Sequence, residues 1–295
     1  MNFADYFNPS DAMPNPLGLS KNSSVFGKVQ VYGMSKKVEI GSKTLAIIGV
    51  GESRNSNNPS ANQSPDAIRK YLYGLSGACI KKPIVDLGNL KPTPSPVDTY
   101  MAIRDVVSEL VSKGVTILVL GGTQEITWPI FMGISEHKDL INLSLIDHTI
   151  DMGNEQGDFS STCFIDRIVS ESPSKLFSLN MLGYQGYLTS LEHIDILTKR
   201  NDELARLGFV RSSMAEVEPT LRDSDIVSLD MGCIRQGDSP GSISPSPNGL
   251  YAEEVCQLAR YSGLSNQVKV FGIFELNISS DPSNQSSHLA AQILW

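Results

Sequence analysis

Several features that mark other classes of protein are scarce in this sequence of 295 residues. Its four cysteines lie far apart and form no CxxC pair, which argues against a disulfide framework and a zinc knuckle and fits a reducing cytoplasm. No apolar run approaches the roughly 20 residues that cross a bilayer, and the N-terminus shows no basic and apolar leader. Basic residues are in the minority, 24 against 32 acidic ones. We therefore predict a cytoplasmic protein with no membrane contact and no nucleic-acid partner.

Histidine is also scarce, with four residues in the chain. No GxSxG or HExxH motif occurs, so a histidine-based catalytic triad is not favoured. Gly49 and Gly51 form a lone GxG with no GxxG or GK[ST] continuation, which argues against a dinucleotide or phosphate loop.

What the sequence does contain is an alternation of short apolar runs and helical patterns. Several of the runs are apolar on both faces, as in a parallel sheet that is covered on both sides. The alternation predicts a three-layer α/β/α sandwich with a mainly parallel sheet of about eight strands. The predicted strands are 44–50, 83–88, 115–122, 141–147, 176–184, 205–210, 225–230 and 268–276.

Capping residues mark the predicted helices. Ser64 and Pro65 precede one helical pattern, and Thr189 or Ser190 precedes another. Asp98 is predicted to cap the helix 98–113, which Gly114 ends. Asn248 precedes a fourth helical pattern that Gly263 closes.

The two ends of the chain differ from its middle. Residues 1–43 show weak periodicity and several prolines, and we expect an extension packed on a single domain that spans 44–295. This extension could cover a sheet edge or bind another protein. The sequence stops within an uncapped helical pattern, which suggests a truncated last helix, with a frayed terminal helix as the alternative.

Polar residues follow four of the predicted strands. They form the segments Gly121–Glu125, Asp147–Asp151, Ser228–Gly232 and Glu275–Asn277. Ligands of open parallel sheets bind beyond the carboxyl ends of the strands, so these segments are expected to meet in one cleft.

The four segments, in this order, resemble the motifs of the ureohydrolases, the arginase, agmatinase and formiminoglutamase family. That family carries a GGDHS-like motif, a DAHxD-like motif, an S-x-D-x-D motif followed by PG, and a Glu-x-Asn element; Pro240-Gly241 matches the PG. The resemblance covers roughly residues 44–295 and is closest to formiminoglutamase-like proteins. It implies an arginase-like fold and hydrolysis of C–N bonds in amidino or guanidino compounds.

The resemblance also implies a site for two manganese ions, held by two histidines and four aspartates. Asp147, Asp151 and Asp230 match three of the aspartates. Three carboxylates cannot fill the coordination shells of two such ions.

The other three ligand positions are lost. Gln124 and Thr149 stand where the family has histidines, and Gly232 stands where it has the fourth aspartate. His148 occupies the neighbouring alanine position. We therefore expect no tightly bound cofactor, and the alternative is one weakly held Mn²⁺ or Mg²⁺ ion.

Three clustered aspartates without a metal would repel one another. Arg235 follows the Asp230 strand, and we expect it either to turn inward as a substitute cation or to lie on the surface. Glu275, with Asn277, matches family residues at the ligand site. Glu275 could bind a guanidinium or amidine group or close a structural ion pair.

Two functions follow from these patterns. The first is a ureohydrolase relative with a degraded manganese site, which binds a small amidino, guanidino or amino-acid-like ligand or acts as a scaffold. The alternative is a divergent metal-dependent amidine hydrolase that uses the three aspartates. The resemblance also suggests a homo-oligomer.

Overall fold

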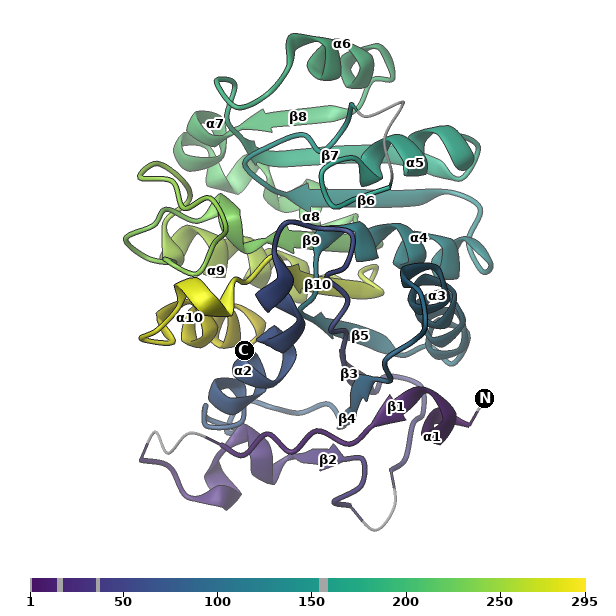
Figure 1. Cartoon of the computed structure of the whole chain (residues 1–295), viewed down its shortest axis with the longest axis vertical. Coiled ribbons are helices and arrows are strands. Elements are labelled where there is room, and N and C mark those ends of the chain that lie inside the picture. Colours follow the sequence, from purple (N-terminus) through teal and green to yellow (C-terminus); the bar gives the residue numbers. More distant parts are fainter. Residues whose placement is uncertain (1, 15–17, 36–37, 154–158) are drawn as a thin grey trace.

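The computed structural model describes residues 2–14, 18–35, 38–153 and 159–295. In this part of the chain the strands form one sheet, in the order β1-β4-β3-β5-β10-β9-β6-β7-β8, with β2 also paired to β4 (Figure 1). Strand β1 pairs antiparallel with β4, and all the other pairings are parallel. The predicted fold class is confirmed.

The strands of the described residues are short and largely buried. Their bounds are β1 (Phe7–Asn8), β2 (Val29–Val31), β3 (Leu45–Gly49), β4 (Ile84–Leu90), β5 (Thr116–Leu120), β6 (Ile141–Ile146), β7 (Leu176–Tyr184), β8 (Glu203–Arg206), β9 (Ile226–Asp230) and β10 (Val270–Phe274).

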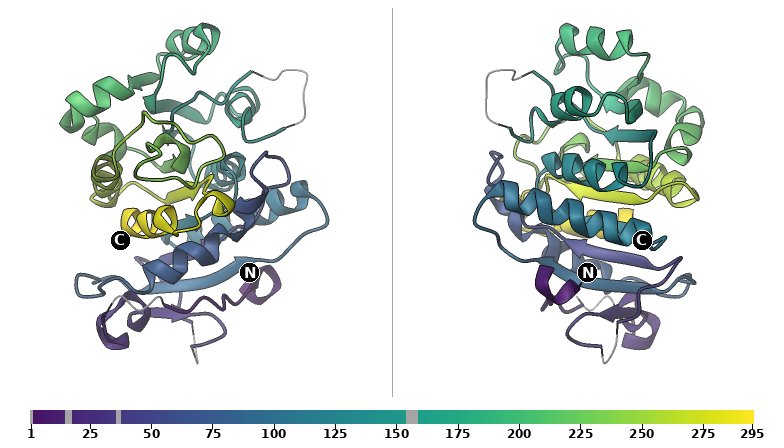
Figure 2. Two further views of the ribbon diagram at one scale, coloured as in Figure 1. Left: turned by 60° about the vertical axis from the view of Figure 1, so that its left-hand side comes forward. Right: turned by 90° about the vertical axis from the view of Figure 1, so that its right-hand side faces the viewer.

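The helices cover both faces of the sheet (Figure 2). Their bounds are α1 (Phe3–Tyr6), α2 (Ser64–Leu72), α3 (Pro96–Ser112), α4 (Thr127–Ser135), α5 (Phe164–Glu171), α6 (Leu191–Lys199), α7 (Leu207–Ser212), α8 (Glu218–Arg222), α9 (Ala252–Gly263) and α10 (Gln285–Leu294). The 3-10 turns are η1 (Lys21–Ser23), η2 (Val25–Gly27), η3 (Pro59–Gln63), η4 (Gln124–Ile126), η5 (Met214–Glu216), η6 (Met231–Cys233) and η7 (Ile278–Ser280). Among the described residues no helix is long and apolar enough to span a membrane.

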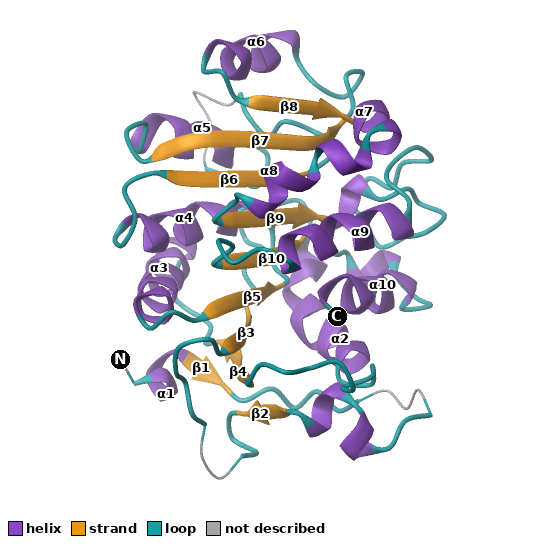
Figure 3. Ribbon diagram, turned by 180° about the vertical axis from the view of Figure 1, so that it is seen from behind, coloured by secondary structure: helices purple, strands orange, loops and turns teal. Residues whose placement is uncertain are grey.

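Each face of the sheet has its own hydrophobic core. Helices α3, α4 and α5 pack on one face, and α2, α8, α9 and α10 pack on the other (Figure 3). Successive side chains of a strand point to opposite faces of the sheet and pack into different cores. In β3, for example, Ile47 packs into one core and Ile48 into the other. Burial on both faces explains why the strands have few polar residues.

The first 43 residues contribute two strands beyond the predicted eight or so. Val29 pairs with Ile84 at the start of β4, and Phe7 pairs with Leu90 at its end. Both short strands lie on the side of β4 that faces away from β3, so this segment covers an edge of the sheet that would otherwise present unpaired backbone groups.

Two local predictions are wrong. The segment 205–210 is not a strand, because β8 ends at Arg206 and α7 begins at Leu207. Leu207 and Val210 are buried at helical spacing, which the short apolar run did not distinguish from a strand. Helix α3 is capped by Ser95 rather than by Asp98, whose side chain accepts a hydrogen bond from the Ser95 backbone N–H.

The capping box at the start of α3 supports a testable prediction. Ser95 Oγ accepts a hydrogen bond from the Asp98 backbone N–H at 3.2 Å. The substitution Ser95→Ala is expected to lower the free energy of unfolding by about 1 kcal/mol, because it leaves a helix N–H without its acceptor. Urea denaturation measures this change, with Ser112→Ala at the other end of α3 as the control. An equal loss in both variants would contradict the assignment.

The parallel strands end at a common level, and this positions the polar segments. Leu120 of β5 pairs with Gly49 of β3 and with Ile273 of β10. Asp230 of β9 pairs with Phe274 of β10. The loops that follow β3, β5, β6, β9 and β10 therefore leave the sheet side by side, as the sequence predicts.

Candidate functional site

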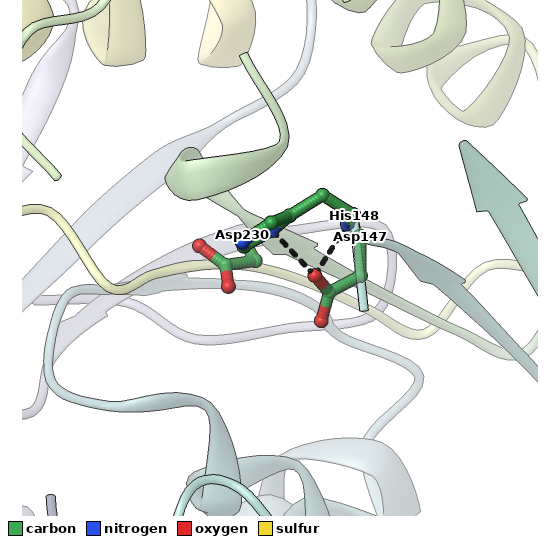
Figure 4. A group of neighbouring side chains, drawn as sticks. All are labelled: Asp147, His148 and Asp230. Carbon is green, nitrogen blue, oxygen red and sulfur yellow. Dashed lines mark hydrogen bonds and ion pairs between the residues drawn. The ribbon is translucent and has the colours of Figure 1, made fainter. Parts of the chain in front are cut away.

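Three of the side chains beyond β6 and β9 form one compact group (Figure 4). Each of Asp147, His148 and Asp230 offers a ligand atom that lies within 4.8 Å of the other two. Asp147 and Asp230 are buried, at 1 % and 6 % exposed, and the His148 side chain is 15 % exposed. His148 Nδ1 lies 3.0 Å from Asp147 Oδ1, as an ion pair that is not aligned as a hydrogen bond.

Sequence reasoning missed His148, because the resemblance places it at an alanine position. The local turn explains its direction. Asp147 Oδ1 accepts hydrogen bonds from the backbone N–H groups of His148 and Thr149, at 2.5 and 3.1 Å. The backbone folds back over the carboxylate, and the imidazole lies between the carboxylates of Asp147 and Asp230 (Figure 4).

The two side chains at the lost histidine positions have other partners. Gln124 Nε2 donates to Ser228 Oγ at 3.2 Å, and Gln124 Oε1 has no hydrogen-bond partner within the described part of the chain. Thr149 Oγ1 donates to Asp151 Oδ1 at 3.0 Å. Each side chain therefore engages the site as a neutral hydrogen-bonding group.

Glu275 is held at the edge of the same group. Its Oε1 accepts the Gln124 backbone N–H at 3.0 Å, and its Oε2 accepts Asn58 Nδ2 at 3.1 Å. The Glu275 backbone has φ of 61°, a left-handed conformation that is uncommon for a residue with a side chain. Asn58 also donates to the Glu275 backbone carbonyl and so helps to hold this conformation. Asn58 lies in the Asn-rich loop 53–64, but no pattern in that loop singled it out.

Asn277 has the contacts of a structural residue. Its Oδ1 accepts hydrogen bonds from Ser60 Oγ and from the Ser280 backbone N–H, at 3.0 and 2.9 Å. It thereby caps η7 and ties it to η3. A ligand contact of Asn277 stays a prediction.

Burial and mutual repulsion shift the ionisation of these carboxyl groups. Burial raises the pKa of Asp151 and Asp230 well above its usual range, and the charge of Asp147 adds to the shift. Burial also raises the pKa of Glu275 to about 7, against the hydrogen bonds from Gln124 and Asn58. Burial and repulsion therefore favour the protonated, neutral form of these carboxyl groups unless a cation lies beside them.

His148 is the cationic group that faces these carboxylates. Burial opposes its charge, but the contact with Asp147 and the charges of Asp147, Asp230 and Glu275 outweigh burial and raise the pKa of His148 to about 9. Of the two alternatives for Arg235, the substitute cation is wrong, and the structure shows the surface position. Its Nε and Nη2 donate to Asp238 at 2.9 and 3.0 Å, and its guanidinium lies 4.1 Å from the ring centre of Tyr251.

A further buried carboxyl group, that of Glu125, interacts with Glu275; its segment was predicted to reach the site, but the residue itself was not singled out. It is 0 % exposed, and its Oε1 accepts hydrogen bonds from Thr123 Oγ1 and the Tyr100 hydroxyl, at 2.8 and 3.3 Å. Burial raises the pKa of Glu125 to about 8. The loop 152–164 is also predicted to lie near this site, and residues 154–158 of that loop lie outside the described residues.

Comparisons with known proteins bear on the family and the fold. A model of the arginase family matches residues 43–295. The chain is 24 % identical to the formimidoylglutamase of Photorhabdus laumondii over 268 residues, which cover 85 % of this chain and 84 % of that protein.

Solved structures give the same result for the fold. The formimidoylglutamase of Bacillus subtilis has a TM-score of 0.79 at 23 % identity, with 88 % of this chain and 87 % of that chain covered. The formiminoglutamase of Trypanosoma cruzi with Mn²⁺₂ has a TM-score of 0.79 at 18 % identity, with 88 % and 93 % covered.

The donor set does not fit a pair of manganese ions. Thr149 and Gln124 supply neutral oxygens in place of two imidazoles, and Gly232 supplies no side-chain donor. A Cβ added to Gly232 would lie 3.0 Å from His148 Cε1, so the imidazole borders the space that a side chain at this position would enter. No step of a two-metal reaction can be assigned to these residues.

Proposed function

This chain belongs to the arginase family, and from that premise we propose that it is a ureohydrolase relative without a dinuclear manganese centre. The site around Asp147, Asp230 and Glu275 binds a small ligand that carries an amidinium or guanidinium group and does not hydrolyse it at paired ions. The observation that carries the proposal is the combination of Gln124, Thr149 and Gly232 at three ligand positions, with the His148 imidazole close to Gly232.

The charge of the cleft supports a cationic ligand. The charges of Asp147, Asp230 and Glu275 act on the His148 imidazole, and burial makes the negative charge of these carboxylates unfavourable unless a cation pairs with them. A planar cation satisfies carboxylates through parallel N–H···O bonds. The free amino group of a ligand such as agmatine would add to this attraction.

Metal analysis tests the first half of the proposal. The purified chain, incubated with Mn²⁺ and then desalted, is expected to retain close to no manganese, because the donor set does not fill two coordination shells. Mass spectrometry of the metal content gives the stoichiometry. Two equivalents per chain would overturn the proposal.

Glu275→Gln tests the second half. The substitution removes a charge that faces the ligand and is expected to weaken binding of agmatine or formiminoglutamate at least tenfold, about 1.4 kcal/mol. Isothermal titration calorimetry on the metal-free protein measures the affinity. Glu253→Gln, on the exposed face of α9, is the matched control and should bind as the unmodified chain does. Equal affinities for all three proteins would count against a role of Glu275 in ligand binding.

One observation favours a second candidate, a hydrolase with a single metal ion. Asp147, His148 and Asp230 offer two carboxylates and an imidazole within 4.8 Å of one another, a donor set that suits one divalent transition-metal ion. Release of urea, ammonia or formamide from arginine, agmatine or formiminoglutamate under added Mn²⁺ is the measurement. Turnover that a chelator abolishes would favour this candidate over the first.

Location and assembly complete the proposal. All four cysteines fall within the described residues and none of them forms a disulfide there, which supports a cytoplasmic location. A homo-oligomer stays a prediction, and light scattering of the purified chain tests it.

A further inference from the structure

We infer that the His148 imidazole acts as a plug, by which we mean that it fills part of the space in which the family's paired-ion centre would lie. Its imidazole blocks the space that a ligand side chain at position 232 needs, so the residues at 148 and 232 form a coupled pair. This inference rests on the proposed function, because it explains how the paired-ion centre is closed. It makes His148 an additional obstacle to a paired-ion centre, beside the three replaced ligand positions 124, 149 and 232.

The space above Gly232 has three walls. A Cβ built on Gly232 would lie 3.0 Å from His148 Cε1, 3.0 Å from Asp230 Oδ1 and 3.3 Å from Ser242 Oγ. Contacts of this length are tighter than side chains normally accept, and the side chain of an aspartate extends further than a Cβ. Asp230 matches a ligand of the family, so it would be present next to any residue at position 232. His148 stands where the family has alanine, so its ring is the neighbour of Gly232 that the family pattern does not contain.

The ring is held in place by its surroundings. The His148 backbone N–H donates to Asp147 Oδ1 at 2.5 Å, and its carbonyl accepts the Gln185 backbone N–H at 2.9 Å. The ring itself lies against Asp147, with Nδ1 3.0 Å from Oδ1. Movement of the ring away from Gly232 would break this contact.

The wall on the other side is fixed as well. Asp230 Oδ1 accepts the Gly232 backbone N–H at 2.6 Å, which closes the turn into η6. Gly232 does not have a positive φ, so its backbone alone does not require glycine. The reason for glycine at this position is therefore the neighbouring atoms, and the imidazole is one of the two closest.

A thermodynamic cycle tests the coupling without any metal. Gly232→Ala is expected to lower the Tm by roughly 2–4 °C when His148 is present. The same substitution in a His148→Ala background is expected to lower the Tm by no more than half as much, because the added methyl group then enters the space that the ring has left. Equal losses in the two backgrounds would overturn the plug.

Metal binding tests the consequence. The triple variant Gln124→His, Thr149→His, Gly232→Asp restores the family's six ligand types and keeps the ring, and the quadruple variant adds His148→Ala. After incubation with Mn²⁺ and desalting, the quadruple variant is expected to hold two equivalents of manganese per chain and the triple variant fewer than one. Circular dichroism checks that both variants are folded, and the cycle above decides the question if either is not.

The outcomes separate this inference from the proposed function. Two equivalents in both variants, with almost none in the unmodified chain, would overturn the plug and leave the proposed function standing. Two equivalents in the unmodified chain would overturn both. Folded variants that both fail to bind two ions would also overturn the plug, since removal of the ring would then not reopen the centre.

Discussion

Arg69→Met is expected to lower the free energy of unfolding by about 3–5 kcal/mol. Arg69 lies in α2 and is 0 % exposed. Its Nε and Nη2 donate to the two carboxylate oxygens of Asp86 in β4, at 2.8 and 3.0 Å. Removal of the guanidinium leaves the charge of Asp86 buried, with the Tyr73 hydroxyl as its remaining side-chain donor within the described residues. The loss reflects this uncompensated charge more than the net value of the ion pair.

Urea denaturation of two further variants checks this explanation. The double variant Arg69→Met, Asp86→Leu should recover a large part of the lost stability, because neither charge is then left alone. Lys199→Met breaks the exposed pair of Lys199 with Asp195 on α6 and should change the stability by about 0–1 kcal/mol. A double variant that is less stable than Arg69→Met would show that the guanidinium matters through its packing and not through the pairing.

Stability is expected to fall as the pH rises from about 5 to about 8, and Glu125 is one of the buried carboxyl groups that cause this fall. The pKa of Glu125 is about 8 in the folded protein against 4.5 as its ordinary value. The folded state therefore holds a proton that the unfolded state loses above pH 4.5, and the contribution to stability disappears as the pH passes through the folded value. A shift of this size corresponds to roughly 3–5 kcal/mol as an upper limit. His148, whose pKa rises from 6.5 to about 9, acts in the same direction at higher pH.

The measurement is the Tm by calorimetry between pH 5 and 8.5. Glu125→Gln keeps the shape of the side chain and removes the titration, so its Tm should depend on pH less steeply than that of the unmodified chain. Glu253→Gln, in an exposed position on α9, should keep the full slope. If Glu125→Gln has the slope of the unmodified chain, burial of this carboxyl is not the cause of the pH dependence.

Much of the fold follows from the pattern of apolar runs, because strands buried on both faces have a clear sequence signature. The sequence pattern does not identify an element whose residues are all buried, because such an element shows no contrast between an apolar and a polar face. Helix α4 buries seven of its nine residues and therefore has no polar face to reveal its period. The run 205–210 joins the end of β8 to α7, and a six-residue apolar stretch does not define which of the two states it adopts.

The site is predictable to the extent that strand ends define it. Asp147 and Asp230 meet because β6 and β9 are neighbouring parallel strands, a consequence of topology. The direction of a side chain within a loop depends on its local hydrogen-bond and packing partners. The periodicity of apolar residues, which predicts helices and strands, carries no information about these partners. Arg235 pairs with Asp238, three residues further along the chain, and packs on the ring of Tyr251. It therefore does not reach the more distant carboxylates of the site. His148 is turned inward by the hydrogen bonds that Asp147 makes to the following backbone.

The position of the first strands has a consequence for folding during synthesis. Phe7 of β1 pairs with Leu90 of β4, and Val29 of β2 pairs with Ile84. The ribosome releases both short strands long before their partner exists, and the closure of such long loops is entropically unfavourable. Docking of the N-terminal segment is therefore a late step, and a nascent chain that has already assembled β3, β4 and β5 passes through a stage with one flank of its sheet open to other chains.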